Sequence, residues 1–143
     1  MMNKAYQIIL VLAFFSCATT TKVDPSKKPL YEVLIHQTYG GAAIRFFEIL
    51  SEPDEIVMLQ KDPKLKNRIN SADINSSNFI IMNMGEKSTI GYRIEIESVV
   101  ETDKNIIITT KEIAPISGSI AIQQITNPYC VVKINSKKQI LFK

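Results

Sequence analysis

The sequence predicts an α+β fold that is mainly β, with antiparallel strands in a sandwich-like or partly closed barrel domain and one short helix. From Phe79 onward, short runs rich in β-branched residues alternate with clusters of turn-forming residues. One of these runs, residues 92–97, alternates apolar and charged side chains without interruption, as a half-buried strand does. The chain has 143 residues, 45% of them apolar, which is enough for one domain with its own core.

The first elements of this domain are expected between residues 30 and 63. Residues 30–41 read as a strand that closes on Gly40 and Gly41, and residues 42–51 as a strand that pairs back across that turn in a first hairpin. A short helix begins near Pro53 and ends at Asp62 and Pro63, because the residue before a proline disfavours helical backbone. A polar connection follows.

The remaining elements are all predicted to be strands. Residues 78–84 have little polar alternation, which is typical of a strand covered on both sides. In the next strand, residues 92–97, apolar and charged side chains alternate, so one face is expected to be buried and the other to be exposed to solvent. Residues 101–105 form a hairpin turn, residues 106–113 the returning strand, and three short strands follow within residues 121–125, 129–134 and 139–142. The buried face carries Tyr92, Ile94 and Ile96, and the wet face carries Arg93, Glu95 and Glu97.

The N-terminus predicts export and attachment to a membrane. Lys4 precedes an apolar block of eight residues, Ile8 to Phe15, which is far too short to span a bilayer as a helix. The following Ser16 and Cys17 complete a pattern that resembles a bacterial lipoprotein lipobox. We therefore expect a lipoprotein signal peptide at residues 1–16, the lipidated Cys17 with a flexible tether at residues 17–29, and a single globular domain at residues 30–143. This predicts a lipid-anchored protein of the bacterial cell envelope, on its periplasmic or surface side; the alternative is an ordinary secreted protein.

Charge and residue spacing favour a non-catalytic protein with no cofactor. The net charge is +3, and the charges are scattered along the chain, which argues against a nucleic-acid partner. With one histidine, His36, and no Cys-X-X-Cys spacing, too few ligands exist for a zinc site. We expect His36 to be a partly buried strand residue and Cys130 a small buried hydrophobic residue without a disulfide partner.

Two short stretches remain as candidates for contact with a partner, Lys87–Tyr92 and Thr126–Tyr129. Each contains a tyrosine, which can bury its ring and keep its hydroxyl on a polar partner. The structural alternative is that each tyrosine simply packs at the end of a strand. The candidate partner-binding residues are Thr89, Ile90, Gly91, Tyr92, Asn127, Pro128 and Tyr129.

Together the two stretches resemble the C-terminal domain of the PrcB family, over roughly residues 78–143. The resemblance implies a non-catalytic accessory or stabilising subunit that binds an envelope protease, a protease complex or another envelope protein. The family usually has glycine at the position of Ile90. The matching residues are Gly85, Thr89, Gly91, Tyr92, Thr126, Pro128, Tyr129, Val131, Val132 and Lys133.

Two alternative functions stay open. Residues 89–92 are similar to the Thr-Thr-Gly-Tyr loop of chagasin-type cysteine-protease inhibitors, which implies protease inhibition, although the chain has no tryptophan. The other alternative is a generic ligand-binding or structural envelope lipoprotein.

Overall fold

The computed structural model describes residues 28–118 and 122–143, and nine strands and two helices lie in this part of the chain. The predicted signal peptide, Cys17 and most of the predicted tether lie outside the described residues. Neither described helix has the length and apolar character to cross a membrane. The elements are β1 (Tyr31–Gln37), β2 (Arg45–Leu50), α1 (Pro53–Gln60), α2 (Asp73–Ser76), β3 (Asn78–Met84), β4 (Lys87–Thr89), β5 (Arg93–Glu101), β6 (Asn105–Ile113), β7 (Gln123–Thr126), β8 (Tyr129–Ile134) and β9 (Gln139–Phe142).

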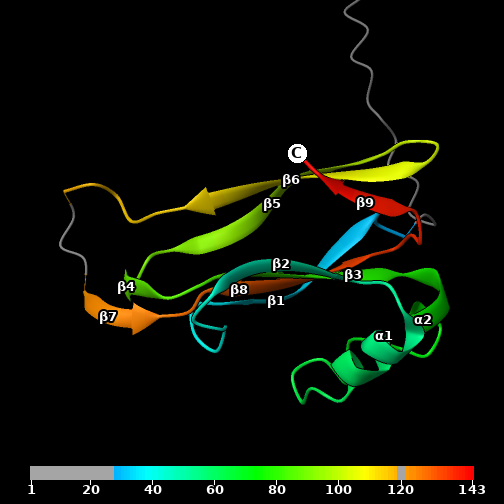
Figure 1. Ribbon diagram of the computed structural model, residues 1–143, viewed down its shortest axis with the longest axis horizontal. Coiled ribbons are helices and arrows are strands. Elements are labelled where there is room, and N and C mark those ends of the chain that lie inside the picture. Colours follow the sequence, from blue (N-terminus) through cyan, green and yellow to red (C-terminus); the bar gives the residue numbers. More distant parts are fainter. Residues whose placement is uncertain (1–27, 119–121) are drawn as a thin grey trace, which may run out of the picture.

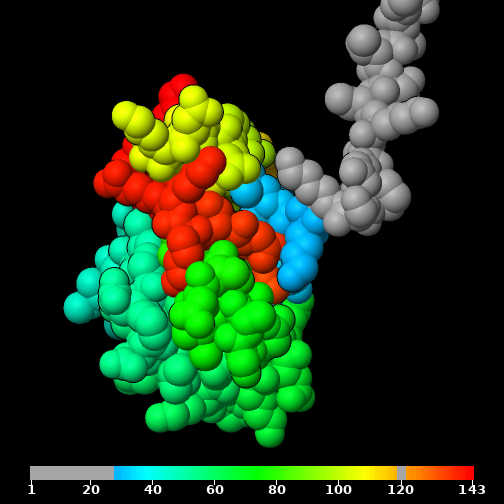
Figure 2. All heavy atoms as spheres, turned by 90° about the vertical axis from the view of Figure 1, so that its right-hand side faces the viewer, coloured from blue at the N-terminus to red at the C-terminus, as the bar shows by residue number. Residues whose placement is uncertain are grey.

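The elements form three layers (Figure 1). The middle layer is a four-stranded sheet in the order β1-β8-β3-β2, with a three-stranded sheet of order β5-β6-β9 on one side. The two helices lie on the other side, and the β4–β7 pair extends from one end. Seen from the opposite end, β1 in blue and β2 in teal lie at the two flanks of the middle sheet (Figure 2). The predicted mainly-β, sandwich-like α+β fold is therefore confirmed; the sheets do not close into a barrel.

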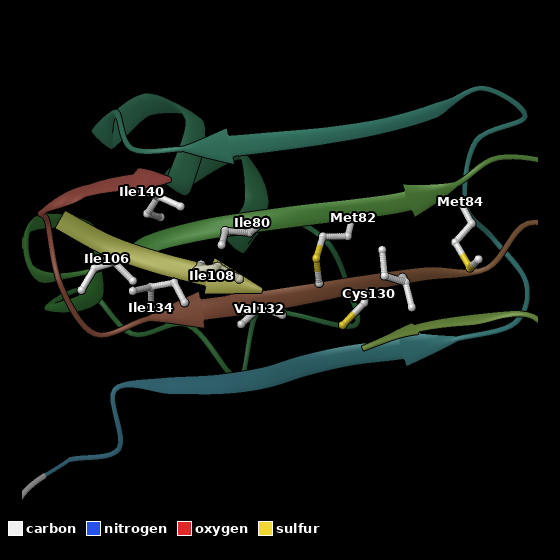
Figure 3. Close-up of a cluster of buried hydrophobic side chains, with 10 residues drawn as sticks. Ile80, Met82, Met84, Ile106, Ile108, Cys130, Val132, Ile134 and Ile140 are labelled. Atoms are coloured by element: carbon white, nitrogen blue, oxygen red, sulfur yellow. The ribbon is translucent and has the colours of Figure 1, made fainter. Parts of the chain in front are cut away.

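The larger core lies between the two sheets (Figure 3). β3 and β8 run through the centre of the middle sheet, and alternate residues of each point into this core. From β8 these are Cys130, Val132 and Ile134, which confirms the prediction that Cys130 is a small buried residue. Burial raises the pKa of the Cys130 thiol to about 12, and the nearby charge of Glu95 adds to this effect.

A second core lies between the middle sheet and the helical layer. The intervening residues of the same two strands, such as Phe79 and Val131, pack here against Ile56 of α1 and Leu65 of the segment that follows. This two-sided cover explains why β3 shows little polar alternation in the sequence, and it confirms that prediction.

Helix α1 begins at Pro53 as predicted and ends at Gln60, just before the Asp62–Pro63 pair. Its first turn is stabilised by Glu55, whose carboxylate accepts hydrogen bonds from the backbone amides of Ser51 at 3.0 Å and Glu52 at 3.1 Å. Helix α2 has four residues and lies in the stretch that the sequence analysis treated as a polar connection.

The predicted first hairpin is wrong, because β1 and β2 are the two outer strands of the middle sheet. β1 pairs with β8, so that Tyr31 lies opposite Ile134, and β2 pairs with β3. The connection through Gly40 and Gly41 instead crosses the end of the sheet, past β8 and β3. Local glycines indicate a change of direction, but contacts with residues far along the chain decide which strands pair.

His36 lies in a strand as predicted, but its side chain is exposed and not partly buried. The register of β1 against β8 shifts between Val33 and Ile35, and both Leu34 and Ile35 are buried. His36 lies opposite Cys130 on an outer strand, where no further strand of the sheet covers it. The prediction depended on the place of His36 in a strand, which does not by itself determine how far the side chain is buried.

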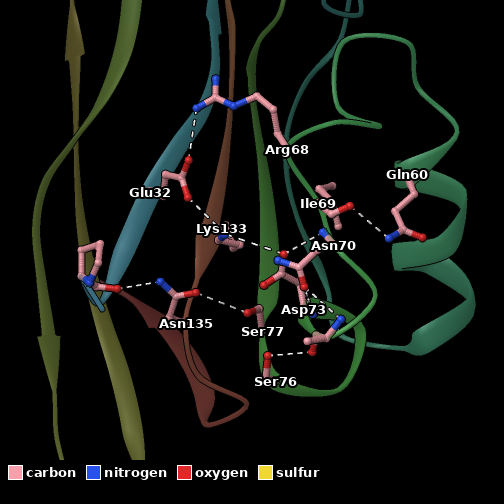
Figure 4. A network of polar contacts seen from close by, with 12 residues as sticks. Glu32, Gln60, Arg68, Ile69, Asn70, Asp73, Ser76, Ser77, Lys133 and Asn135 are labelled. Carbon is pink, nitrogen blue, oxygen red and sulfur yellow. Dashed lines mark hydrogen bonds and ion pairs between the residues drawn. The ribbon is translucent and has the colours of Figure 1, made fainter. Parts of the chain in front are cut away.

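The strands β8 and β9 are joined through Asn135–Lys138 but lie in different sheets, and β9 pairs parallel with β6. This parallel pair is an exception to the predicted antiparallel arrangement. The connection also fastens the start of the domain. The Asn135 side-chain amide donates a hydrogen bond to the Pro29 carbonyl at 2.6 Å, and its backbone amide donates to the Leu30 carbonyl at 2.9 Å (Figure 4).

A network of charged side chains joins the middle sheet to the helical layer (Figure 4). Lys133 of β8 lies 3.1 Å from the Glu32 carboxylate on β1 and 3.7 Å from the Asp73 carboxylate on α2. Arg68 adds a second contact to Glu32 at 3.2 Å and donates to the Leu34 carbonyl at 2.6 Å. The hydrogen bond from Lys133, reinforced by its charge and that of Arg68, holds the pKa of the Glu32 carboxyl below its ordinary value.

Candidate functional site

The two candidate stretches meet at the antiparallel β4–β7 pair, since the first contains β4 and the second begins with Thr126, the last residue of β7. Lys87 is opposite Thr126 and Thr89 is opposite Gln123, with an irregularity between these pairs. The Thr126 hydroxyl donates a hydrogen bond to the Thr89 carbonyl at 3.2 Å, and the Thr126 side chain is fully buried. A hydrogen bond from the Ile90 amide to the Ile122 carbonyl, 3.3 Å, continues the pairing beyond β4. This pairing is not apparent from the sequence.

Gly91 turns the chain from this strand pair into β5. Its φ of +101° lies in the left-handed region that favours glycine, and a Cβ here would lie 3.1 Å from Cγ of Pro115. Ile90 has no such requirement, since within the described residues every positive φ belongs to a glycine. The replacement of the family's usual glycine by Ile90 therefore leaves the backbone here unstrained.

Tyr92 lies at the start of β5 and packs, half-buried, against the core between the two sheets. The ammonium nitrogen of Lys87 lies 5.4 Å from the centre of its ring, within the range of a cation–π contact. The predicted inward orientation of Tyr92 is confirmed.

Asn127, Pro128 and Tyr129 hold the end of the middle sheet together. The Asn127 amide donates to the Thr38 carbonyl at 3.1 Å, and its carbonyl accepts from the Gly41 amide at 3.0 Å. The buried Pro128 accepts from the Met84 amide at 3.0 Å. The Tyr129 hydroxyl accepts a hydrogen bond from the Lys64 ammonium group at 3.0 Å. In these contacts only Tyr129 acts through its side chain; Asn127 and Pro128 act here through backbone groups, which fix their positions in the fold and not their residue types.

The two tyrosines do not form one site. Tyr92 packs into the core between the sheets, whereas Tyr129 packs against the core on the helical side. Each tyrosine packs at a strand end, as the structural alternative proposed. Of the candidate partner-binding residues in the first stretch, Thr89 and Ile90 lie next to β7.

Two exposed isoleucines on this strand pair escaped the sequence analysis. Ile122 is 60% exposed and Ile125 is 63% exposed, and both lie on the β7 side next to Ile90 and Thr89. We call Ile90, Ile122 and Ile125 the ribbon surface. The sequence signal was present as the run Ala121–Ile125, but an apolar residue in a short strand is ordinarily taken as part of the core.

The exposed residues of this strand pair offer a surface for contact. Within the described residues, no group of three or more His, Cys, Asp or Glu side chains is placed to hold a metal ion. Cys130 is buried with a raised pKa, which disfavours the reactive thiolate. The ribbon surface supplies apolar side chains and backbone hydrogen-bonding groups at an exposed strand pair.

The fold and the paired stretches define a β-sandwich domain with a helical layer, in which a short strand pair projects from one end. Residues 78–135 match the family model described as PrcB C-terminal, and this segment, from β3 to β8, belongs to that family. No curated protein matched the chain, and no solved structure did. β1, β2, the helices and β9 lie outside the matched segment, yet they complete both of its cores.

Proposed function

We propose that the chain is a non-catalytic accessory subunit that binds a protease or protease complex of the bacterial envelope through the ribbon surface. The match to the PrcB C-terminal family supports a role related to a protease complex. The observation that carries the proposal is that the segment matched by the family model contains the projecting β4–β7 strand pair, with two exposed isoleucines, Ile125 within β7 and Ile122 just before it. Exposed apolar side chains grouped at one place are typical of protein contact sites.

The ribbon surface also has the physical properties of a contact site. Isoleucines that lose their exposure in a complex contribute roughly 1.5–3 kcal/mol each when fully buried. Among the described strands, β4 and β7 pair only with each other, so each has an outer edge whose backbone groups a partner strand can use. A partner could therefore gain apolar burial and backbone hydrogen bonds at the same place.

Affinity purification of the full chain from detergent-extracted membranes tests this proposal. We expect a protease to co-purify, and the double variant Ile122→Ser with Ile125→Ser to lose it, with affinity reduced roughly thirtyfold or more for a loss of about 2 kcal/mol. The matched control is Val100→Ser, which removes a 53% exposed apolar side chain from β5 and should leave the complex intact.

Recovery of no protease would contradict the proposal, and so would an equal loss of the protease by the Val100→Ser control. Direct inhibition of papain by the purified chain, abolished by changes at Thr89 to Tyr92, would instead support the inhibitor alternative.

We further propose attachment to the membrane through lipid on Cys17. The support is the sequence pattern at residues 4–17, and several acyl chains on one residue make a stable anchor. Cys17→Ser should move the protein from the membrane to the soluble fraction, and unchanged fractionation would refute lipidation. Loss of this anchor should not abolish binding at the ribbon surface, so the two proposals fail separately.

A further inference from the structure

The helical layer leaves part of the middle sheet uncovered, and a groove runs along this face. Figure 1 shows both helices gathered near one end of the sheet. Two adjoining hollows, of about 170 and 360 Å³, share Leu59 and Asp62 as lining residues. We call the combined feature the helix-side groove and define it by Phe46, Glu48, Leu50, Met58, Leu59 and Asp62.

The floor of the groove is apolar because of the register of β2. Phe46, Glu48 and Leu50 lie opposite Asn83, Ile81 and Phe79 of β3, and Phe79 and Ile81 belong to the core on the helical side. These β2 residues therefore share the face that the helices cover only in part. Across the groove, α1 contributes Leu59 and the 70% exposed Met58.

The rim of the groove is acidic. Glu48, Glu55 and Asp62 line it, and no lysine or arginine does. None of the ion pairs found among the described residues involves these three carboxylates. The nearby Lys64 directs its ammonium group to Gln37 at 2.8 Å and to Tyr129. The part of the groove along β2 and α1 thus carries three carboxylates without an ion pair to any described residue, while the Lys64 ammonium group lies at the other edge, beside Gly40 and Tyr129.

Backbone geometry adds a third property. β2 is an outer strand of the middle sheet, so every second residue directs its amide and carbonyl away from β3. A peptide strand placed beside β2 would bond to these groups and direct alternate side chains over the apolar floor. A small amphiphilic cation or a lipid would leave the backbone groups unused.

We propose that the helix-side groove binds an extended peptide segment whose groove-facing residues, every second one along the peptide, include both apolar residues and lysine or arginine. The apolar side chains lie over Leu50, Met58 and Leu59, and the cations face Glu48 and Asp62. This site lies on the helical side of the sheet and is independent of the protease contact proposed for the ribbon surface.

Binding of a labelled synthetic peptide to the full chain in non-ionic detergent tests the inference. The probe is a peptide of about nine residues that carries leucine and lysine in turn at every second position, with serine between them; one control replaces lysine by glutamate and another replaces leucine by serine. We expect binding of the first peptide that weakens several-fold as the salt concentration rises from about 0.05 to about 0.3 M, and at least tenfold weaker binding of both controls. Equal binding of the glutamate peptide would overturn the proposal.

Variants place the binding on the molecule. Glu48→Lys, at an exposed position, should weaken binding of the lysine-containing peptide about three- to tenfold, because one attraction becomes a repulsion. The matched control Glu97→Lys makes the same charge change at an exposed position on β5 and should have no effect. Met58→Ser should also weaken binding, whereas Val100→Ser should not.

Amide chemical-shift changes provide a second, independent readout. We expect them at Glu48, Leu50, Leu59 and Asp62. Changes confined to β7, equal effects of the two charge reversals, or binding that micelles alone reproduce would each overturn the proposal.

Discussion

Replacing Lys133 with methionine keeps much of the side chain's length and removes its charge. In the folded protein the lysine side chain is 10% exposed and lies between the half-exposed carboxylate of Glu32 and that of Asp73, which is 3% exposed. Glu32 can turn towards solvent when its partner is lost. Asp73 cannot, and of the contacts described it would keep a 2.9 Å hydrogen bond from the Asn70 amide.

The expected loss of unfolding free energy follows from this difference between the two carboxylates. Removing one partner of a fully buried pair costs about 3–5 kcal/mol, because the remaining charge stays desolvated. The 3.7 Å separation from Asp73 and the exposure of Glu32 place the present case lower, at about 2–3 kcal/mol of unfolding free energy. For a domain of this size the melting temperature should fall by roughly 6–15 °C.

Urea denaturation of four proteins measures the effect: wild type, Lys133→Met, Asp73→Asn and the double variant. The double variant should recover about 1–2 kcal/mol relative to the sum of the single changes, because the unpaired buried charge is then absent. As a control, Lys138→Met breaks a 2.9 Å ion pair with the half-exposed Glu101 and should cost less than about 1 kcal/mol. A loss at Lys133 no greater than at Lys138, or simple additivity in the double variant, would refute the reasoning.

Three further predictions concern the backbone, the thiol and acid stability. Gly91→Ala should lower the unfolding free energy by about 1–2 kcal/mol in urea denaturation, because alanine disfavours a φ of +101° and its methyl group would crowd Pro115; unchanged stability would contradict this. In the Cys17→Ser variant, Cys130, whose thiol pKa is raised to about 12, should react with iodoacetamide at neutral pH only after urea unfolds the chain; rapid labelling of this folded variant would show the Cys130 thiol to be accessible. Because the folded-state pKa of Glu32 is lowered, its contribution to stability is present above its ordinary pKa of 4.5 and is lost as the pH falls through the folded value. Glu32→Gln should therefore flatten the decline in stability below about pH 4.5, and identical pH profiles would count against this role.

Those parts of the fold that depend on local pattern could be predicted from the sequence. The expectation that Cys130 is a small buried residue was correct, and the nearly continuous apolar run from Phe79 indicated a strand covered on both sides. The turn at Gly40 and Gly41 led to a wrong hairpin, since the partner of Tyr31 is Ile134, far along the chain. Such pairing depends on cores that form only in three dimensions.

Only part of the candidate site could be predicted, because the rest depends on the same long-range contacts. Thr89 and Thr126 were named separately, and a long-range strand pair joins them. Tyr92 and Tyr129 have similar sequence settings, yet they occupy opposite sides of the middle sheet. Whether the Ile125 side chain is exposed depends on which residues pack around it in the folded protein, so the sequence pattern of its own strand could not reveal it.

The hydrogen bonds of Asn135 to Pro29 and Leu30 determine how the domain would respond to mechanical load. They fasten the chain where β1 begins, next to Ile134, while the β4–β7 pair projects from the other end of the sheet (Figure 1). A pull between a membrane anchor and a partner held at the β4–β7 pair would thus act along the strands. Antiparallel hydrogen bonds lie across the strand direction, so those between β1 and β8 would resist such a force in shear, together, instead of opening one after another.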